Sequence, residues 1–202
     1  PYIRAGLYFY DLLSPRKVAP RHRAFTKRES EHLEPALRTK DLTAAYLYHD
    51  AQIKMPERLC IEYVAEARDA GADIRNYNAV DFIVVNNGSV SGVDYHDVHS
   101  GQRQHADASL IINATGPWVD TILEATGEPL RPRLGLTKGS HIVLDLQNRG
   151  PRHALIAKAH SDGRSIFVIP WFDHHVIGTT DIQFAGDPAS VTTEDWEVEY
   201  LL

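Results

Sequence analysis

The sequence has little cysteine and no excess of positive charge. Its one cysteine among 202 residues, Cys60, excludes an internal disulfide and a thiolate metal cluster made by this chain alone, and fits a reducing compartment. The formal net charge of −6 argues against a nucleic-acid partner, because binding phosphates requires a basic face. No apolar run approaches the roughly 20 residues of a membrane-spanning helix. The composition, 43% apolar and 24% charged, is that of an ordinary globular protein.

Other familiar signals are also missing. No G-x-G-x-x-G pattern occurs, so motifs alone do not prove dinucleotide binding. The chain starts without methionine and stops at Leu202 inside an expected helix, so we expect a segment of a longer protein. His174 and His175 are adjacent, and neighbours on a strand point to opposite faces, so we expect no metal site there.

The clearest helix is expected over residues 55–71. Pro56 suits the first helical position, and Gly71 suits a left-handed cap at the end. Apolar residues recur there every three or four positions. Cys60 falls on or beside this face, so we expect a packed rather than a reactive thiol.

Most other elements are expected to be strands. The periodicity changes towards two after residue 74, and Asn87-Gly88 between apolar runs is a hairpin signal. Strands are expected at 42–49, 80–85, 90–98, 103–113, 140–145, 153–159, 166–170 and 176–179. Short helices are expected at 5–13, 30–35 and 118–125, with a last helix capped by Thr192 or Thr193. We expect exposed loops at 14–28 and 131–133, with the basic residues Arg16, Lys17, Arg21 and Arg23 as a solvated face.

The stretch from residue 110 to 141 is the best candidate for a binding site. Leu110–Ile112 is expected to be a buried strand that ends in the corner Ala114-Thr115-Gly116, where a glycine lets a ligand approach the backbone. A tight turn without a ligand is the alternative. The lysine, serine and histidine of Lys138–His141 suit an anionic substrate with a proton to move. A polar loop with a half-buried histidine is the alternative, and residues 177–181 could equally bind a ligand or form a turn.

Several ordered blocks together resemble the flavin-dependent glycerol-3-phosphate dehydrogenases of the respiratory, aerobic type. The resemblance covers nearly the whole chain and rests on Ala5–Asp11, Asn113–Val119, Lys138–Val143, Ile169–Trp171, Ile177–Asp181 and Gly186–Pro188.

The resemblance implies a mixed α/β fold. It would comprise part of a glutathione-reductase-like FAD-binding domain and a D-amino-acid-oxidase-type antiparallel substrate domain, without the N-terminal Gly-rich βαβ unit. The implied division is a connecting helix and basic loop at 1–40, a substrate-domain strand at 41–55, part of the FAD-binding domain at 56–130, and the substrate sheet with the start of a following helix at 131–202.

The resemblance also implies the site residues. FAD would contact Ala79, Val80, Ala114, Thr115, Gly116, Trp118 and Gly139. Glycerol 3-phosphate would contact Lys138, Ser140, His141 and Thr180, with His141 as the catalytic base for the 2-hydroxyl while hydride passes to the flavin. No metal is implied. The arginines that hold the phosphate would lie outside the chain, and Arg131 and Arg133 do not match them.

The implied reaction yields dihydroxyacetone phosphate, with quinone as electron acceptor. The resemblance implies that the protein is attached peripherally to the cytoplasmic face of a bacterial inner membrane. A homodimer is compatible with the resemblance. The segment alone is expected to be inactive. The alternatives are a glycerol-3-phosphate oxidase or another flavin oxidase of the same fold, and, in a different class, a non-catalytic interaction domain that retains the fold.

Overall fold

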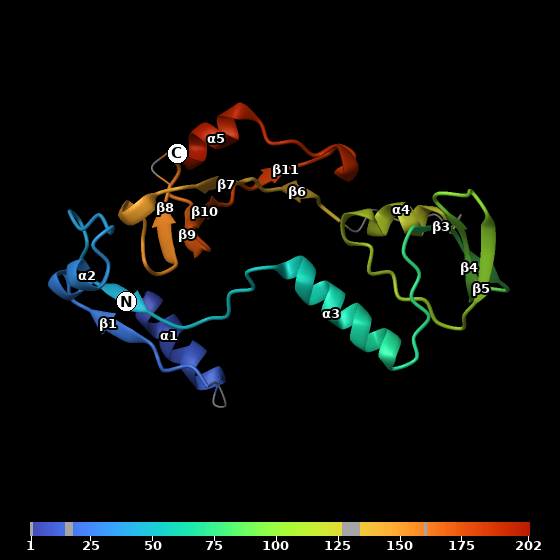
Figure 1. The fold of residues 1–202 in the computed structure, drawn as a ribbon, viewed down its shortest axis with the longest axis horizontal. Helices are drawn as coiled ribbons and strands as arrows, with labels where there is room; N and C mark the ends of the chain where they lie inside the picture. Colours follow the sequence, from blue (N-terminus) through green and yellow to red (C-terminus); the bar gives the residue numbers. More distant parts are fainter. Residues whose placement is uncertain (1, 15–17, 127–133, 160) are drawn as a thin grey trace. The chain divides into compact units, whose positions relative to one another are not determined.

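The computed structural model describes residues 2–14, 18–126, 134–159 and 161–202 (Figure 1). It divides into two compact units: Pro1–Pro56 with Gly139–Thr180 and Thr193–Leu202, and Glu57–Lys138 with Asp181–Thr192. The expected loop at 131–133 and the basic residues Arg16 and Lys17 lie outside the described residues. Among the helices that are described, none combines the length and apolar character needed to cross a membrane.

A four-stranded antiparallel sheet forms the centre of the first unit. Its order is β7-β10-β9-β8, with β7 at His141–Leu144, β8 at Leu155–Lys158, β9 at Ser165–Trp171 and β10 at His174–Gly178. These strands confirm the four expected from the sequence. Ile166 and Ile177 are buried on one face beneath Leu201 of α5 (Asp195–Leu201). This apolar contact fixes α5 against the sheet.

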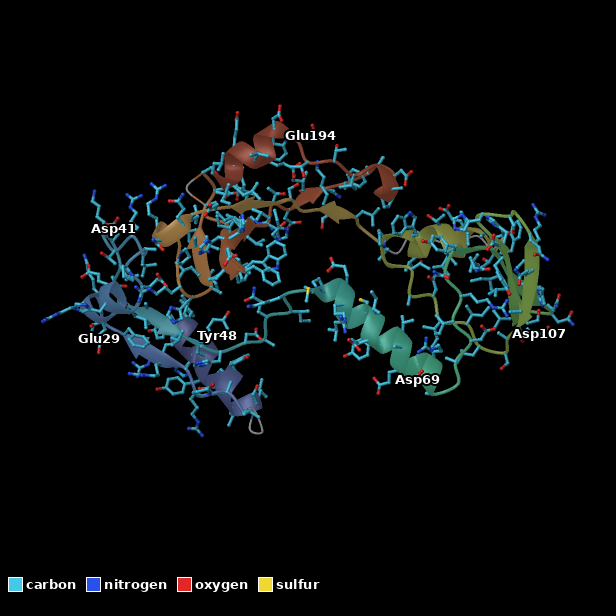
Figure 2. All side chains as sticks on the ribbon, in the orientation of Figure 1. Glu29, Asp41, Tyr48, Asp69, Asp107 and Glu194 are labelled. Carbon is cyan, nitrogen blue, oxygen red and sulfur yellow. The ribbon has the colours of Figure 1, made fainter. Side chains whose placement is uncertain are left out.

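Helix α5 differs from the sequence expectation at its start. Its N-cap is Glu194 (labelled in Figure 2) and not Thr192 or Thr193. The backbone N–H of Glu194 donates to the carboxylate of Glu197 at 2.9 Å, which is half of a capping box. The N–H group of the N-cap residue is therefore satisfied by the side chain of Glu197, which lies in the first turn of the helix.

The N-terminal part of the first unit contains α1 (Tyr2–Leu13), β1 (Arg23–Phe25), α2 (Lys27–Leu33) and β2 (Ala45–Leu47). Part of the loop expected at 14–28 is thus β1 and the start of α2. Thr26 caps α2, and its N–H and hydroxyl both bond to Glu29, which lowers the pKa of that carboxyl. The strand expected at 42–49 is confirmed only over three residues.

A buried carboxylate ties this N-terminal part to the loop that precedes β8 in the same unit. Glu34 is 4% exposed, and its Oε2 accepts the backbone N–H groups of Arg152 and His153 at 2.9 and 3.1 Å. The Nδ1 of His153 lies 3.1 Å from the same oxygen. Residues far apart in the sequence are therefore joined by one acceptor.

In the second unit, α3 (Pro56–Asp69) confirms the helix expected at 55–71. Gly71 takes a φ of +97°, as its role as a left-handed cap requires. The expectation that Cys60 is packed is wrong, because the thiol is exposed. The reason is that, within the described ranges, no side chain of α3 is buried, so its apolar stripe has no covering layer.

The meander expected after residue 74 is present as β3 (Asn78–Asn86), β4 (Ser89–Asp97) and β5 (Arg103–Asp107). Asn87 and Gly88 both have positive φ, at 52° and 76°, as the hairpin signal predicted. The third strand, however, ends at Asp107 (labelled in Figure 2). Leu110 and Ile112 are 75% and 82% exposed, so the buried strand expected there is wrong for the described structure. No described strand pairs with this run.

Short elements complete the description. The turn after Thr115 holds η1 (Gly116–Trp118) and α4 (Val119–Glu124), which confirm the helix expected at 118–125. The remaining pieces are β6 (Thr137–Lys138), η2 (Gln147–Arg149), β11 (Ile182–Gln183) and η3 (Pro188–Ser190). β6 and β11 form a two-stranded antiparallel ladder in the second unit.

Candidate active site

The sheet of the first unit has one open face, and His141 lies at the end of it. Antiparallel register places His141 beside Gly178 and Gly178 beside Phe167, so these residues form a row across three strands. His141 is exposed, and Phe167 is 42% exposed. Val143, on the same strand and face as His141, is 50% exposed. An imidazole thus stands at the edge of a mainly apolar surface.

Gly178 determines where the His141 ring can lie. A Cβ built on Gly178 would be 2.5 Å from His141 Cδ2 and 3.0 Å from its Cγ. Real Cβ atoms do not approach carbon so closely, so the ring occupies the space that only glycine leaves open. His141 is therefore held against the sheet by packing while its outer edge remains accessible.

The residues before His141 are fixed by a buried hydrogen-bond network. Ser140 and Thr180 are 7% and 3% exposed, and both hydroxyls donate to Oε1 of Glu197 at 2.9 Å. The backbone N–H of Ser140 donates to the Thr180 hydroxyl at 2.8 Å. The resemblance predicts that these two hydroxyls contact the substrate. To do so, they would have to give up their hydrogen bonds to Glu197.

Gly139 is close to the chain itself. A Cβ there would collide with the Thr179 side chain and lie 2.7 Å from the Thr180 carbonyl oxygen. Glycine is thus required at position 139 for the chain to pass this close to Thr179 and Thr180. This requirement holds whether or not Gly139 also contacts a cofactor. Lys138 precedes it in the second unit, and its ammonium donates to the Thr192 carbonyl at 2.9 Å.

The second unit holds the corner predicted to face the cofactor. Gly116 has a φ of +58°, and nothing lies within 4 Å of the place where a Cβ would be. Thr115 bonds to Asn113 through its hydroxyl at 2.7 Å, and the Asn113 amide donates to the Val119 carbonyl at 3.0 Å. Asn113 therefore stabilises a left-handed corner whose backbone is open to a ligand.

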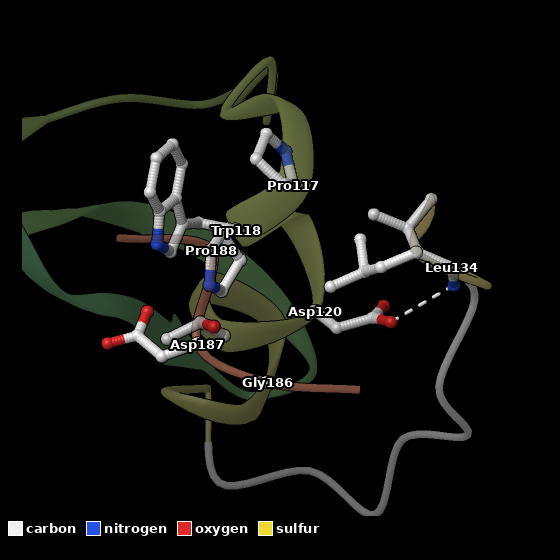
Figure 3. Close-up of a pocket in the computed structure, with 9 residues that line it drawn as sticks. Pro117, Trp118, Asp120, Leu134, Gly186, Asp187 and Pro188 are labelled. Carbon is white, nitrogen blue, oxygen red and sulfur yellow. Dashed lines mark hydrogen bonds between the residues drawn. The ribbon is translucent and has the colours of Figure 1, made fainter. Parts of the chain in front are cut away.

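The other predicted cofactor residues also lie in the second unit. Ala79 and Val80 belong to β3, where they pair with His96 and Tyr95 of β4. Trp118 lines a hollow of about 460 Å³ together with Asp120 and Pro188 (Figure 3). In this hollow the Asp120 carboxylate accepts the Leu134 N–H at 3.0 Å.

The structure thus groups the predicted site residues in two sets. Gly139, Ser140, His141 and Thr180 come together in the first unit, and the predicted residues of the second unit are Ala79, Val80, Ala114, Thr115, Gly116, Trp118 and Lys138. Sequence reasoning missed Glu197 and Gly178. The spacing could have revealed Glu197, because residues four apart lie on the same face of a helix and Leu201 is buried. An acid on that face is expected to be buried as well.

Comparisons with known proteins find relatives over nearly the whole chain. The family model described as FAD dependent oxidoreductase matches residues 7–202. A glycerol-3-phosphate dehydrogenase of Synechocystis sp. is 36% identical over 99% of this chain and 38% of its own length. An alpha-glycerophosphate oxidase of Streptococcus pyogenes is 34% identical over 99% of this chain and 33% of its own. The structure of the Bacillus halodurans glycerol-3-phosphate dehydrogenase complexed with FAD superposes with a TM-score of 0.76 at 32% identity, over 89% of this chain and 36% of that one.

These matches define the class of protein. The chain belongs to the FAD dependent oxidoreductase family, and it spans about a third of the length of the curated relatives it matches. Its mixed α/β architecture with antiparallel sheets is consistent with the D-amino-acid-oxidase type of fold. The open left-handed backbone at Gly116 fits the close approach of a cofactor such as FAD.

Proposed function

We propose that the intact protein is an FAD-dependent glycerol-3-phosphate dehydrogenase. The observation that carries this proposal is His141, an accessible imidazole packed against Gly178 at the edge of an apolar sheet face. Relatives named glycerol-3-phosphate dehydrogenase and the family match supply the substrate class. The reaction would convert sn-glycerol 3-phosphate to dihydroxyacetone phosphate.

His141 would act as the general base. Its imidazole would take the proton from the substrate 2-hydroxyl, because histidine is the side chain that most often serves as a general base. When bound, FAD supplies the acceptor for the hydride that leaves the same carbon. Lys138 adds positive charge for the phosphate, and Ser140 and Thr180 hold the turn before His141 in place. Phosphate-binding arginines would come from outside this chain.

FAD would be held by Ala79, Val80, Ala114, Thr115, Gly116, Trp118 and Gly139. The open corner at Gly116 supports this assignment most directly, because its backbone carries no neighbouring side chain on that side. In this proposal the chain is part of a glutathione-reductase-like FAD-binding domain and of a substrate domain, divided as the sequence predicts at about residues 40, 55 and 130. A Gly-rich βαβ unit would complete the cofactor site.

The electron acceptor we propose is quinone, with the protein attached peripherally to the cytoplasmic face of a bacterial inner membrane as a homodimer. The names of the relatives called dehydrogenases support a dehydrogenase over an oxidase, and the quinone, the membrane attachment and the homodimer come from the resemblance alone. The relative named alpha-glycerophosphate oxidase supports oxygen as the alternative acceptor. Hydrogen peroxide formed in step with substrate oxidation would favour the oxidase, whereas turnover that needs an added quinone would favour the dehydrogenase.

The test of the proposal is flavin reduction in the intact, FAD-loaded protein. Anaerobic mixing with glycerol 3-phosphate should bleach the flavin, and His141→Ala should slow this by roughly a hundredfold or more, the scale of losing a general base. His174→Ala is the matched control, since His174 is exposed on β10 of the same sheet. An unchanged rate in His141→Ala would overturn the role of His141. A colourless intact protein would instead support a non-catalytic domain.

A further inference from the structure

Glu197 is a fully buried acid that the proposed chemistry does not use. It is 0% exposed and lies in the first turn of α5, on the side that faces the sheet. Its Oε1 accepts from Ser140 and Thr180 and its Oε2 accepts the N–H of Glu194, each at 2.9 Å. Burial of a carboxylate is costly unless donors surround it, so this group of donors is a specific feature of the fold.

The donors form a closed arrangement around Ser140. The Ser140 N–H donates to the Thr180 hydroxyl, which donates to Glu197, and Glu197 also accepts the Ser140 hydroxyl. The Ser140 carbonyl accepts the Thr180 N–H at 3.2 Å. A hydroxyl has one hydrogen, so Ser140 is free to accept one from Thr193, whose oxygen lies 3.2 Å away. Both peptide groups and the side chain of Ser140 are thereby fixed.

This arrangement determines how His141 leaves the turn. Ser140 directly precedes His141, and His141 must enter β7 opposite Gly178 for its ring to lie on the glycine backbone. If the Ser140 peptide could rotate, the His141 ring would shift relative to a bound substrate. A displacement of about 1 Å at a reacting group can cost as much as a hundredfold in rate.

We infer that Glu197 is a positioning residue: through Ser140 and Thr180 it holds the His141 imidazole in its reactive orientation. The catalytic part of this inference, that Glu197 orients His141 for reaction, rests on the proposed function. Its structural part, that the carboxylate fixes the Ser140 peptide, depends only on the hydrogen bonds.

The experiment compares Glu197→Gln with Glu199→Gln in the intact, FAD-loaded protein. Glu199 lies on the same helix but is exposed, so the control makes the same chemical change in solvent. Glutamine keeps the shape of the side chain but loses the charge that accepts two hydroxyl donors at one oxygen. Hydrogen exchange at the Ser140 amide should accelerate by about tenfold or more in Glu197→Gln, and not in Glu199→Gln.

The catalytic part is tested by a double-mutant cycle on flavin reduction by glycerol 3-phosphate. Glu197→Gln should slow reduction by about tenfold or more in the unsubstituted background, with FAD content retained. It should have little further effect in the His141→Ala background, because a residue that acts through His141 has nothing left to orient. An equal loss in both backgrounds would show a merely structural role and overturn the inference.

A second pair of variants covers the case in which Glu197→Gln fails to fold. Thr180→Val removes the hydroxyl that joins Ser140 to Glu197, and Thr180→Ser keeps it. The serine variant should restore both slow amide exchange and the rate of flavin reduction, and failure to restore either contradicts the inference. Unchanged amide exchange in Glu197→Gln would overturn the structural part whatever the substrate. Absence of bleaching in the unsubstituted protein would instead overturn the proposed function and the catalytic part with it, while the exchange data still decide the structural part.

Discussion

The His141 ring lies directly on the backbone of Gly178, its register partner on β10, so that a Cβ on Gly178 would approach His141 Cδ2 to 2.5 Å. The same glycine separates His141 from Phe167 along the row. An absent side chain on one strand therefore determines the position of an imidazole on the next.

Gly178→Ala is expected to displace the His141 ring while the protein still folds. The added methyl meets the His141 ring, which can rotate away, and lies 3.0 Å from the Ser140 carbonyl oxygen, which has to shift only slightly, so FAD content should be retained. Flavin reduction by glycerol 3-phosphate should slow by about a hundredfold, because the base no longer meets the 2-hydroxyl. Gly6→Ala is the control, since nothing lies within 4 Å of a Cβ there. Normal reduction by Gly178→Ala would disprove the role given to this contact.

Glu34→Ala should destabilise the protein by about 1–3 kcal/mol. The buried carboxylate accepts the N–H groups of Arg152 and His153, and removing it leaves these donors without that acceptor. Urea unfolding measures the change, with Glu66→Ala as the control because Glu66 is exposed on α3. A loss no larger than that of the control would mean that water replaces the carboxylate at no cost.

Stability of the meander should depend on pH through His105. The Asp94 carboxylate, 2.6 Å from His105 Nδ1, raises the pKa of the imidazole above its ordinary value of 6.5. A raised folded-state pKa contributes stability that is fully present below the unfolded value and is lost as pH rises through the folded value. Asp94→Asn should therefore lower Tm most at acidic pH and least at alkaline pH. An NMR titration of the His105 ring should show a lower pKa in the variant, and an unchanged pKa would contradict the assignment.

Gly88→Ala should cost about 1 kcal/mol through backbone strain alone. Gly88 has a φ of +76°, and nothing lies within 4 Å of its missing Cβ, so no clash contributes. Thermal unfolding measures the loss, with Gly135→Ala as the control, because an added Cβ there also meets nothing. Equal stability of the two variants would show that the hairpin adapts its turn.

Local signals made much of this fold predictable. The helix α3 was located by Pro56 and Gly71, and the β3-β4 hairpin by Asn87-Gly88, because each of these residues specifies its own backbone conformation. The strands around His141 and Gly178 followed from apolar runs between turns. Register could not be read in this way, so the contact between these two residues was not predicted.

Leu110 and Ile112 show where such reasoning fails. A continuous apolar run predicts a strand only if neighbours cover both faces, and in the described structure β5 ends before this run. Cys60 was misplaced for the same reason, since the apolar stripe of α3 is uncovered. The cofactor and substrate residues came from resemblance, and their roles stay predictions until the variants above are measured.

The two glycines beside the candidate base should tolerate mutation very differently. At Gly139 a methyl group would lie 2.7 Å from the Thr180 carbonyl oxygen, whereas at Gly178 it would lie 3.0 Å from the Ser140 carbonyl oxygen and meet the His141 imidazole, which can rotate, at shorter range. A library of random variants sorted only for soluble, folded protein should lose substitutions at position 139 more completely than alanine at position 178. The same library sorted for growth that requires the oxidation of glycerol 3-phosphate should lose both.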